Sequence, residues 1–194
     1  MMHPDTELRF KDAAFGHGVY ATRFIPLGTI VWVLCELDIR LPAARVAALP
    51  PPYQAIIDRY AYGDAEGDRI LCWDHGRYIN HSCVPAMVEV GAETEIAVAD
   101  LHPGDELTCD YGALNLVQPL RCRCGTADCR GVIGADDDLR VWRQLDTLAR
   151  ASVGVAGLVP QPLQPFVREP GQLADWIAGR VPLPSSRDTH HGAA

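Results

Sequence analysis

The chain has 194 residues, of which 48% are hydrophobic and 22% are charged, a balance that excludes an intrinsically disordered protein. Acidic residues outnumber basic ones by 25 to 17, and the net charge of −8 argues against a dedicated nucleic-acid binder, which needs a basic face. A negative field instead attracts a cationic partner. We expect neither a secretory signal nor a membrane span, because the sequence contains no suitable apolar run.

The first 112 residues are predicted to form short strands with one helical insertion. Residues 29–34 are mostly β-branched and apolar, which favours a strand. One helix is expected after the prolines at positions 50–52. Turn residues separate three further predicted strands, of which the first two would form a hairpin: 87–90, 95–99 and 106–109.

The remainder of the chain has a different composition. Residues 136–150 place large apolar side chains at intervals of three, which predicts an amphipathic helix. We expect this helix either to pack behind the cysteine-rich segment that precedes it or to form a dimer contact. Frequent prolines between 157 and 184 predict a wrapping tail or a linker with a short helix near 173–177, and the last residues are expected to be disordered.

Cysteines suggest a metal site. The chain has seven, and three of them lie close together as Cys122-x-Cys124-x4-Cys129. An odd, clustered set without an expected export signal favours metal binding over disulfides. Three thiolates are one ligand short of a tetrahedral zinc site, and the alternative is a reduced loop without metal. The residues leave the fourth ligand open among the histidines and the cysteines at 35, 72, 83 and 109.

Three other segments carry polar side chains of interest. Gly16-His17-Gly18 permits a close approach of the backbone to a ligand. Asn80-His81-Ser82-Cys83 places an amide, an imidazole, a hydroxyl and a thiol in succession, as either a capped turn or a binding loop. Tyr111 follows the last predicted strand, and a lone tyrosine there is usually a packing residue.

The order of these motifs resembles the SET-domain protein lysine methyltransferases. Gly-x-Gly-Val-Tyr-Ala, Arg-Tyr-Ile-Asn-His-Ser-Cys and Pro-Gly-Asp-Glu-Leu-Thr-x-Asp-Tyr-Gly follow one another, and Cys-x-Cys-x4-Cys resembles the post-SET zinc motif. The resemblance implies a mainly β, α+β fold of small curved sheets with a pseudoknot. Because almost nothing precedes residue 7, the chain is similar to compact, stand-alone, often bacterial members. The implied organisation is a SET domain (7–113), a post-SET zinc-binding segment (118–134), a helical and proline-rich extension (135–180) and a disordered tail (181–194).

The activity implied by the resemblance is transfer of methyl groups from S-adenosyl-L-methionine to the ε-amine of lysine in a histone or another basic protein. The alternative is a catalytically silent SET module that acts as a zinc-stabilised binding or regulatory domain. We expect no direct nucleic-acid binding and no membrane association, and the sequence does not indicate an oligomeric state. An intracellular location is expected, cytoplasmic in a bacterium or nuclear in a eukaryote.

The resemblance also implies roles for individual residues. Tyr111 is the implied catalytic tyrosine, whose hydroxyl touches the methyl group and the amine. Cys83 is the implied fourth ligand of a structural zinc ion, with Cys122, Cys124 and Cys129. The implied cofactor-binding residues are Gly16, His17, Gly18, Tyr60, Asn80 and His81.

Two positions depart from the family's pattern. Cys109 stands two residues before Tyr111, where the family has a Phe or Tyr that influences how many methyl groups are added. Cysteine is small and a weak hydrogen-bonder. Its presence at this position therefore predicts di- or trimethylation of the lysine, and the alternative is that Cys109 only packs against its neighbours. Val84-Pro85-Ala86 replaces Asp-Pro-Asn and removes polar groups that brace the loop.

We expect acidic side chains on the peptide groove and not in the lysine channel, because a negative charge there opposes deprotonation of the amine.

Overall fold

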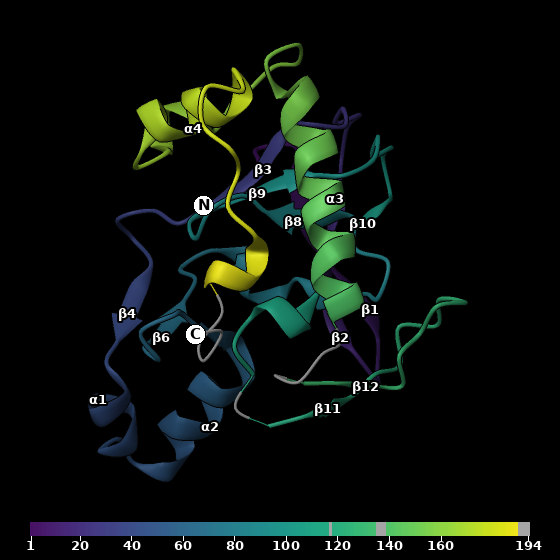
Figure 1. The fold of residues 1–194 in the computed structure, drawn as a ribbon. Helices are drawn as coiled ribbons and strands as arrows, with labels where there is room; N and C mark the ends of the chain where they lie inside the picture. The colour runs from purple at the N-terminus through teal and green to yellow at the C-terminus, as the bar shows by residue number, and fades with distance from the viewer. Residues whose placement is uncertain (117, 135–138, 190–194) are drawn as a thin grey trace.

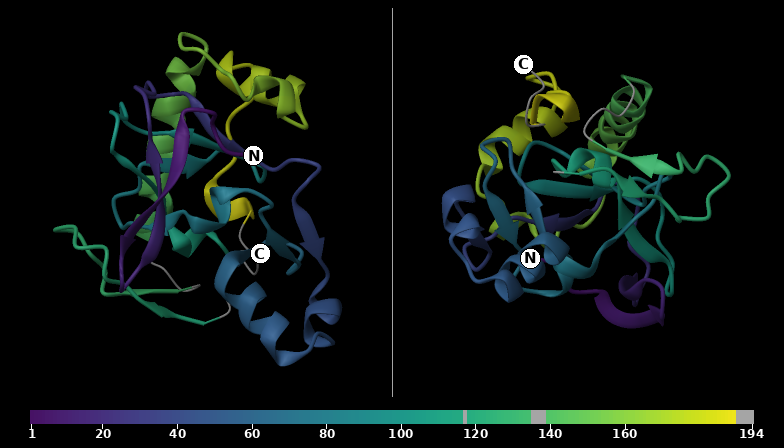
Figure 2. Two further views of the ribbon diagram at one scale, coloured as in Figure 1. Left: turned by 180° about the vertical axis from the view of Figure 1, so that it is seen from behind. Right: turned by 90° about the horizontal axis from the view of Figure 1, so that it is seen from below.

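The computed structural model describes residues 1–116, 118–134 and 139–189, which form four small sheets with helices around them (Figure 1). The first sheet has the order β1 (Thr6–Asp12), β2 (Gly16–Ala21), β10 (Glu106–Cys109) and β7 (Asn80–His81). Its first three strands are antiparallel, whereas β7 runs parallel to β10. Figure 2 shows the β1–β2 hairpin, in purple, from behind. This sheet brings the two ends of the predicted SET segment together.

A second sheet forms the centre of the molecule. It has the order β3 (Ile30–Val33), β9 (Thr94–Ala97) and β8 (Met87–Glu89), and all four residues of β3 are buried. β8 and β9 pair antiparallel, so the predicted hairpin is confirmed. β3 is apolar and rich in β-branched residues along its whole length, as expected for a strand whose two faces both pack against other elements.

The third sheet carries the helical insertion. β4 (Ile39–Leu41), β6 (Arg69–Leu71) and β5 (Ala61–Gly63) pair in that order, and α1 (Ala43–Ala47) and α2 (Pro51–Tyr60) connect β4 to β5. One helix was expected here, but the insertion contains two. Prolines at 50–52 disfavour a helical conformation in the residue before them, which ends the first helix, and Pro51 is well placed to begin the second.

The clustered cysteines lie in the loop that connects the two strands of a small sheet. β11 (Leu120–Arg121) pairs antiparallel with β12 (Val132–Ile133) at the lower edge of the view in Figure 1. Two short 3₁₀ helices flank these strands: η1 (His75–Tyr78) precedes β7, and η2 (Tyr111–Ala113) follows β10. The segment between β11 and β12 is therefore a loop held at its base by the sheet and otherwise dependent on its side chains.

The long helix α3 (Leu139–Ala156) covers the central sheet (Figure 1). It begins at Leu139, after residues outside the described part, and extends beyond the predicted end at 150. Its buried face includes Trp142, Leu145 and Val153, which share one core with Ile30 of β3. The helix therefore packs on the central sheet and not behind the cysteine loop, because its apolar stripe matches the apolar face of that sheet.

One glycine allows this close packing. Gly28 has φ +87°, and a Cβ atom there would lie 2.8 Å from Val155 Cγ2 and 3.0 Å from the carbonyl oxygen of Ser152. Both values are below the usual contact distance, so a side chain at position 28 would force α3 away from the sheet.

The C-terminal segment wraps around the body and is not a linker. It contains η3 (Gln164–Phe166), α4 (Pro170–Ile177), which includes the predicted short helix, and η4 (Ser186–Thr189). The expectation of a disordered tail from 181 is wrong for η4, because Asp146 Oδ1 of α3 accepts hydrogen bonds from Ser185 Oγ (3.1 Å) and Ser186 N (2.9 Å). Residues 190–194 lie outside the described part of the chain.

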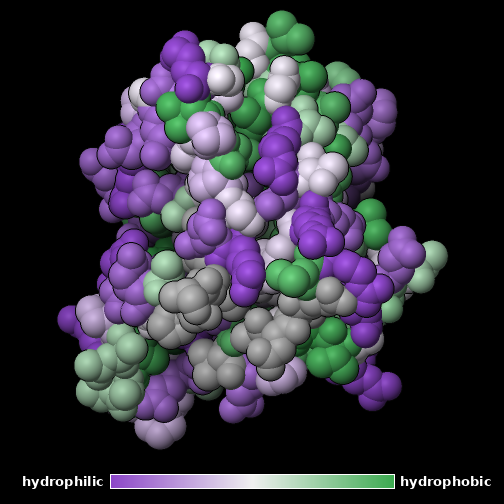
Figure 3. All heavy atoms as spheres, in the orientation of Figure 1, coloured by the Kyte–Doolittle hydropathy of each residue, from purple (hydrophilic) through white to green (hydrophobic). Residues whose placement is uncertain are grey.

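Within the described residues, none of the helices combines the length and the apolar character that a bilayer crossing requires. On the face shown in Figure 3, hydrophilic side chains predominate and hydrophobic residues are interspersed among them.

Candidate functional site

Tyr111 lies where two distant segments of the chain run side by side. β10 and β7 pair in parallel, with Cys109 opposite His81. The backbone N–H of Tyr111 donates to His81 Nδ1 at 3.1 Å, and its hydroxyl donates to the Ile79 carbonyl oxygen at 2.6 Å. Burial raises the pKa of Tyr111, so its phenol stays protonated at neutral pH. The implied pseudoknot requires this juxtaposition of segments 79–82 and 106–111.

A cavity of about 670 Å³ opens beside this tyrosine. Tyr111, Cys109 and Tyr60 all line it, so the three residues that the resemblance placed around methyl transfer share one cavity. Acidic side chains predominate over basic ones in its wall, which favours a cationic ligand. The acidic members are Asp58, Asp64, Glu66, Glu89, Glu93, Glu95 and Asp188, and the basic members are Arg40, Arg59, Arg69 and Arg77.

One of these acids, Glu95, is only partly exposed in the cavity wall. It lies on the central strand β9, opposite Trp32 of β3 and Glu89 of β8. Its Oε2 atom is buried and has no hydrogen-bond partner within the described part of the chain. Burial raises the pKa of this carboxyl to about 7. The absence of acids from the lysine channel stays a prediction, but Glu95 lines the same cavity as Tyr111. The local sequence could not reveal this, because only sheet pairing determines what Glu95 faces.

The glycine motif lies against Asn80. Gly18 is on β2, where a Cβ atom would lie 2.4 Å from Glu106 Oε1 and 3.0 Å from Asn80 Nδ2. Asn80 Nδ2 donates to the His17 carbonyl oxygen at 3.0 Å and to Glu106 Oε1 at 2.7 Å. Glu106 Oε2 also accepts from Lys11 Nζ at 2.6 Å. A side chain at position 18 would therefore displace the Glu106 and Asn80 side chains, and Glu106 joins the site although the sequence did not single it out.

Aromatic rings connect this region to the cavity. The centroid of the Tyr78 ring is 5.7 Å from that of His17 and 5.3 Å from that of Tyr60. At Gly16, which has φ +81°, the nearest group to an added Cβ would be Arg59 Nη2 at 4.0 Å. The predicted cofactor residues are therefore gathered together, except that the His81 ring points toward Tyr111 and Cys83.

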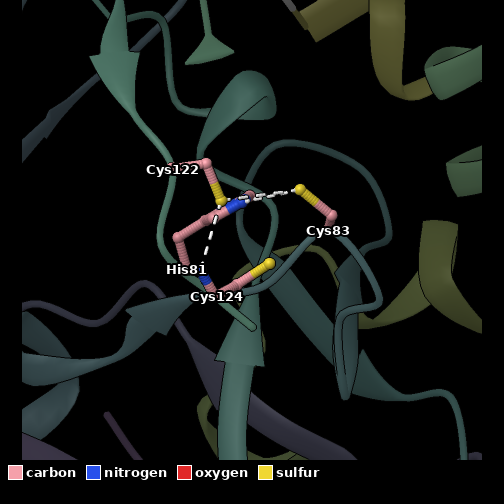
Figure 4. Close-up of side chains that lie close together, drawn as sticks. All are labelled: His81, Cys83, Cys122 and Cys124. Carbon is pink, nitrogen blue, oxygen red and sulfur yellow. Dashed lines mark hydrogen bonds between the residues drawn. The ribbon is translucent and has the colours of Figure 1, made fainter. Parts of the chain in front are cut away.

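Three of the four predicted zinc ligands, Cys83, Cys122 and Cys124, converge with His81 (Figure 4). Donor atoms of His81, Cys83, Cys122 and Cys124 all lie within 4.8 Å of one another. The sulfur atoms of Cys83 and Cys122 are 3.7 Å apart, and His81 Nε2 lies 3.3 Å from Cys83 Sγ. Cys129 packs against the same cluster and its thiol interacts with that of Cys122. The sequence had assigned His81 to the cofactor and had not placed it beside the thiols.

The chemistry of this donor set suits a cation. Burial raises the pKa of Cys83 and, with neighbouring thiols, raises that of Cys122 to about 12. Hydrogen bonds from neighbouring groups lower the pKa of Cys124 to about 6, so one thiolate forms readily, whereas ionisation of the others is favoured by a compensating positive charge. A thiophilic metal ion provides that charge, and three or four thiolates are typical of a structural zinc site.

An ion pair ties the cysteine loop to the strand before Tyr111. Arg130 Nη1 and Nη2 donate to Asp110 Oδ2 and Oδ1, both at 2.6 Å. The Asp110 side chain is only 2% exposed, and its Oδ1 also accepts from the Gly112 N–H at 2.9 Å. The Arg130 backbone N–H donates to Cys83 Sγ at 3.4 Å. Sequence reasoning missed this pair, since nothing in the motif shows which acid faces Arg130.

The loop after Cys83 is braced without the family's usual polar residues. Ser82 Oγ accepts from the Val84 N–H at 3.1 Å and donates to the Val84 carbonyl oxygen at 2.8 Å. The Ala86 N–H donates to the Thr108 carbonyl oxygen at 2.9 Å. These bonds hold the loop, and the expected loss of bracing at Val84-Pro85-Ala86 stays a prediction.

Curated proteins that are similar to this chain include two named histone-lysine N-methyltransferases. The chain is similar to a histone-lysine N-methyltransferase, H3 lysine-9 specific, from Schizosaccharomyces pombe, with 28% identity over 156 residues. It is also similar to the histone-lysine N-methyltransferase Set2 from Drosophila melanogaster, with 38% identity over 92 residues. These matches cover 63% and 43% of this chain but only 31% and 4% of the relatives.

Among solved structures, the methyltransferase domain of the human histone-lysine N-methyltransferase SETMAR is similar at a TM-score of 0.47 and 21% identity, over 69% of this chain and 58% of that one. The SET domain family matches residues 16–112, which run from the glycine motif on β2 to the residue after Tyr111. Because this match spans 97 of the 194 residues, half of the sequence, the chain belongs to the SET domain family.

Proposed function

We propose that this protein is an S-adenosyl-L-methionine-dependent protein-lysine N-methyltransferase. The observation that carries the proposal is the position of Tyr111, whose hydroxyl is anchored to the Ile79 carbonyl on the wall of an acidic cavity. Relatives named histone-lysine N-methyltransferases support it. The substrate we infer is a lysine of a histone or another basic protein, because the cavity wall carries more acidic than basic side chains.

The residues around Gly18 would hold the methyl donor. The rings of His17 and Tyr78 offer stacking surfaces, and Asn80 and Glu106 offer hydrogen-bonding groups, which together fit a ligand with an adenine and an amino-acid moiety. When bound, the donor supplies an electrophilic methyl group on a sulfonium. Tyr60 and Tyr78 lie edge to face, so one aromatic wall continues from this region into the cavity.

In the cavity, the protein has to align and deprotonate the lysine. An in-line displacement depends chiefly on holding the nucleophile and the methyl group at the correct angle, and Tyr111 is placed to do so because both its backbone and its hydroxyl are fixed by hydrogen bonds. The amine must also be neutral to attack. Removing its proton at pH 7 from a pKa near 10.4 costs about 4.6 kcal/mol, which an apolar channel reduces.

The metal we infer is a structural zinc ion bound by Cys83, Cys122, Cys124 and Cys129. Hydrogen bonding argues for Cys129 over His81 as the fourth ligand. His81 Nδ1 accepts the N–H of Tyr111, so the ring proton lies on Nε2, which faces Cys83 Sγ as a donor. A protonated nitrogen has no lone pair for a metal. His81 would thus brace a zinc ligand from outside the coordination sphere.

Methylation is tested directly. Purified protein is incubated with S-adenosyl-L-methionine and either histones or a lysine-rich peptide, and methyl-lysine is measured by mass spectrometry. We expect methylation by the native chain and loss of it in Tyr111→Phe, with donor binding by calorimetry retained. A native protein that binds no donor would instead indicate a silent SET module, and a fully active Tyr111→Phe would remove Tyr111 from the catalytic role.

Ligand identity is tested by metal content. We expect about one zinc per native chain, close to none in Cys129→Ser, and the native amount in His81→Gln. Metal retained by Cys129→Ser and lost by His81→Gln would show that the imidazole is the ligand.

Because thiolate sites of this kind need reduced cysteines, we infer an intracellular location.

A further inference from the structure

Three buried polar atoms without partners meet on one wall of the cavity. Glu95 Oε2, the Tyr62 hydroxyl and Trp32 Nε1 are withdrawn from solvent and make no hydrogen bond within the described residues. All three residues line the cavity, Trp32 is paired with Glu95 across β3 and β9, and the Trp32 and Tyr62 rings lie edge to face at 6.0 Å. Buried polar groups nearly always have partners, so a group of three unpaired ones facing a cavity indicates a polar occupant.

The acid among them has a route to the reaction centre. Glu95, Cys109 and Tyr111 all line the same cavity. An ammonium group entering past Tyr60 and Tyr111 would meet Glu95 as a carboxylate whose Oε2 has no protein partner within the described residues.

We propose that Glu95 is the base that accepts the proton of the target lysine, an inference that rests on the proposed methyltransferase function. The proton moves from the ammonium to a Glu95 carboxylate oxygen, either directly or through one water, which leaves a neutral amine and a neutral carboxylic acid. The amine lone pair then forms the N–CH₃ bond as the C–S bond of the donor breaks and its electron pair returns to sulfur. Glu95 afterwards releases its proton to water.

The surroundings of Glu95 suit this role. The groups that face it are Tyr62 of β5, Cys72 after β6, Cys109 of β10 and Glu89 of β8. Burial raises the pKa of Tyr62, of Cys72 and of Cys109, so these three stay neutral near pH 7. Glu95 itself titrates near neutrality because it is buried, and a base that titrates near the working pH is the most effective.

The test compares the native chain with Glu95→Gln across pH 6 to 10. We expect kcat of the variant to fall by about 10²-fold or more at pH 7.5, and the deficit to shrink as pH rises and the bulk solvent deprotonates the lysine. In the native chain, kcat should fall as the pH drops below neutrality, and the variant should lack this fall. Asp175→Asn, which removes an exposed carboxylate on α4, is the matched control and should behave as the native chain.

Chemical rescue separates a base from a structural residue. Glu95→Ala leaves space for a small carboxylate, so added formate should restore part of kcat, whereas chloride at equal ionic strength should not. A Glu95→Gln protein with native kcat and an unchanged pH profile, or a Glu95→Ala protein that formate does not rescue, would overturn the proposal. A native chain that methylates nothing would overturn the proposed function itself, which the wild-type assay and donor calorimetry detect separately.

Discussion

The contact between Asp110 and Arg130 predicts how strongly the cysteine loop is held against the segment that joins β10 to Tyr111. The perturbation is Arg130→Ala, which removes both 2.6 Å hydrogen bonds and leaves the carboxylate of Asp110 in place. That side chain is 2% exposed, so water cannot replace the lost guanidinium. The change therefore creates a buried charge without its cation, which is far more costly than the loss of an ion pair on the surface.

The magnitude follows from this burial. Removing one partner of a buried pair costs about 3–5 kcal/mol, and because Arg130 is itself 19% exposed we expect the lower end, about 3 kcal/mol. In a protein of this size each kcal/mol lowers the melting temperature by roughly 2–4 °C, so the expected fall is roughly 6–12 °C. Zinc must be present throughout, so that loss of metal is not mistaken for loss of the pair.

The assay is urea and thermal denaturation of Arg130→Ala, Asp110→Asn and the double variant. The matched control is Arg180→Ala, which breaks a 2.7 Å pair with Asp175 whose side chains are 60% and 42% exposed, and we expect it to cost less than about 1 kcal/mol. The double variant should be less destabilised than the sum of the single ones. Equal, small effects in Arg130→Ala and the control, or strict additivity, would refute the reasoning.

Three further predictions concern the cavity and the metal. Cys109→Tyr should shift the product toward monomethyl-lysine by mass spectrometry, and an unchanged distribution would mean that Cys109 only packs. Burial raises the pKa of Glu95 from 4.5 to about 7. The contribution of this carboxyl to the free energy of unfolding is therefore most favourable below pH 4.5 and declines as pH rises through 7. The decline is about 3 kcal/mol, and Glu95→Gln should abolish it when stability is measured at pH 5 and pH 8. A strong chelator should make the loop around Gly125 sensitive to protease while the cores of the sheets stay resistant; unaltered cleavage would argue against a structural metal.

Sequence reasoning succeeded wherever the determining interactions are local. The central strands and the hairpin at 87–97 follow from runs of apolar residues and from turn chemistry, and α3 follows from its helical spacing. Motif order was equally informative, since the glycine motif, Asn80, Tyr111 and the cysteines are each recognisable in a few residues. The boundary between α1 and α2 was missed because a five-residue helix with no buried side chain leaves no periodic pattern.

By itself, the sequence determined the family, the set of short strands and the identity of most residues that meet at the site. Only the tertiary structure decided what Glu95 pairs with, which groups the His81 ring contacts, where α3 packs and which acid holds Arg130. Each of these depends on a contact between residues far apart along the chain, such as the pairing of β9 with β3 or of β10 with β7. A local pattern specifies the chemistry that a residue offers, whereas the environment that changes its pKa or fixes its proton is assembled only when distant strands pair.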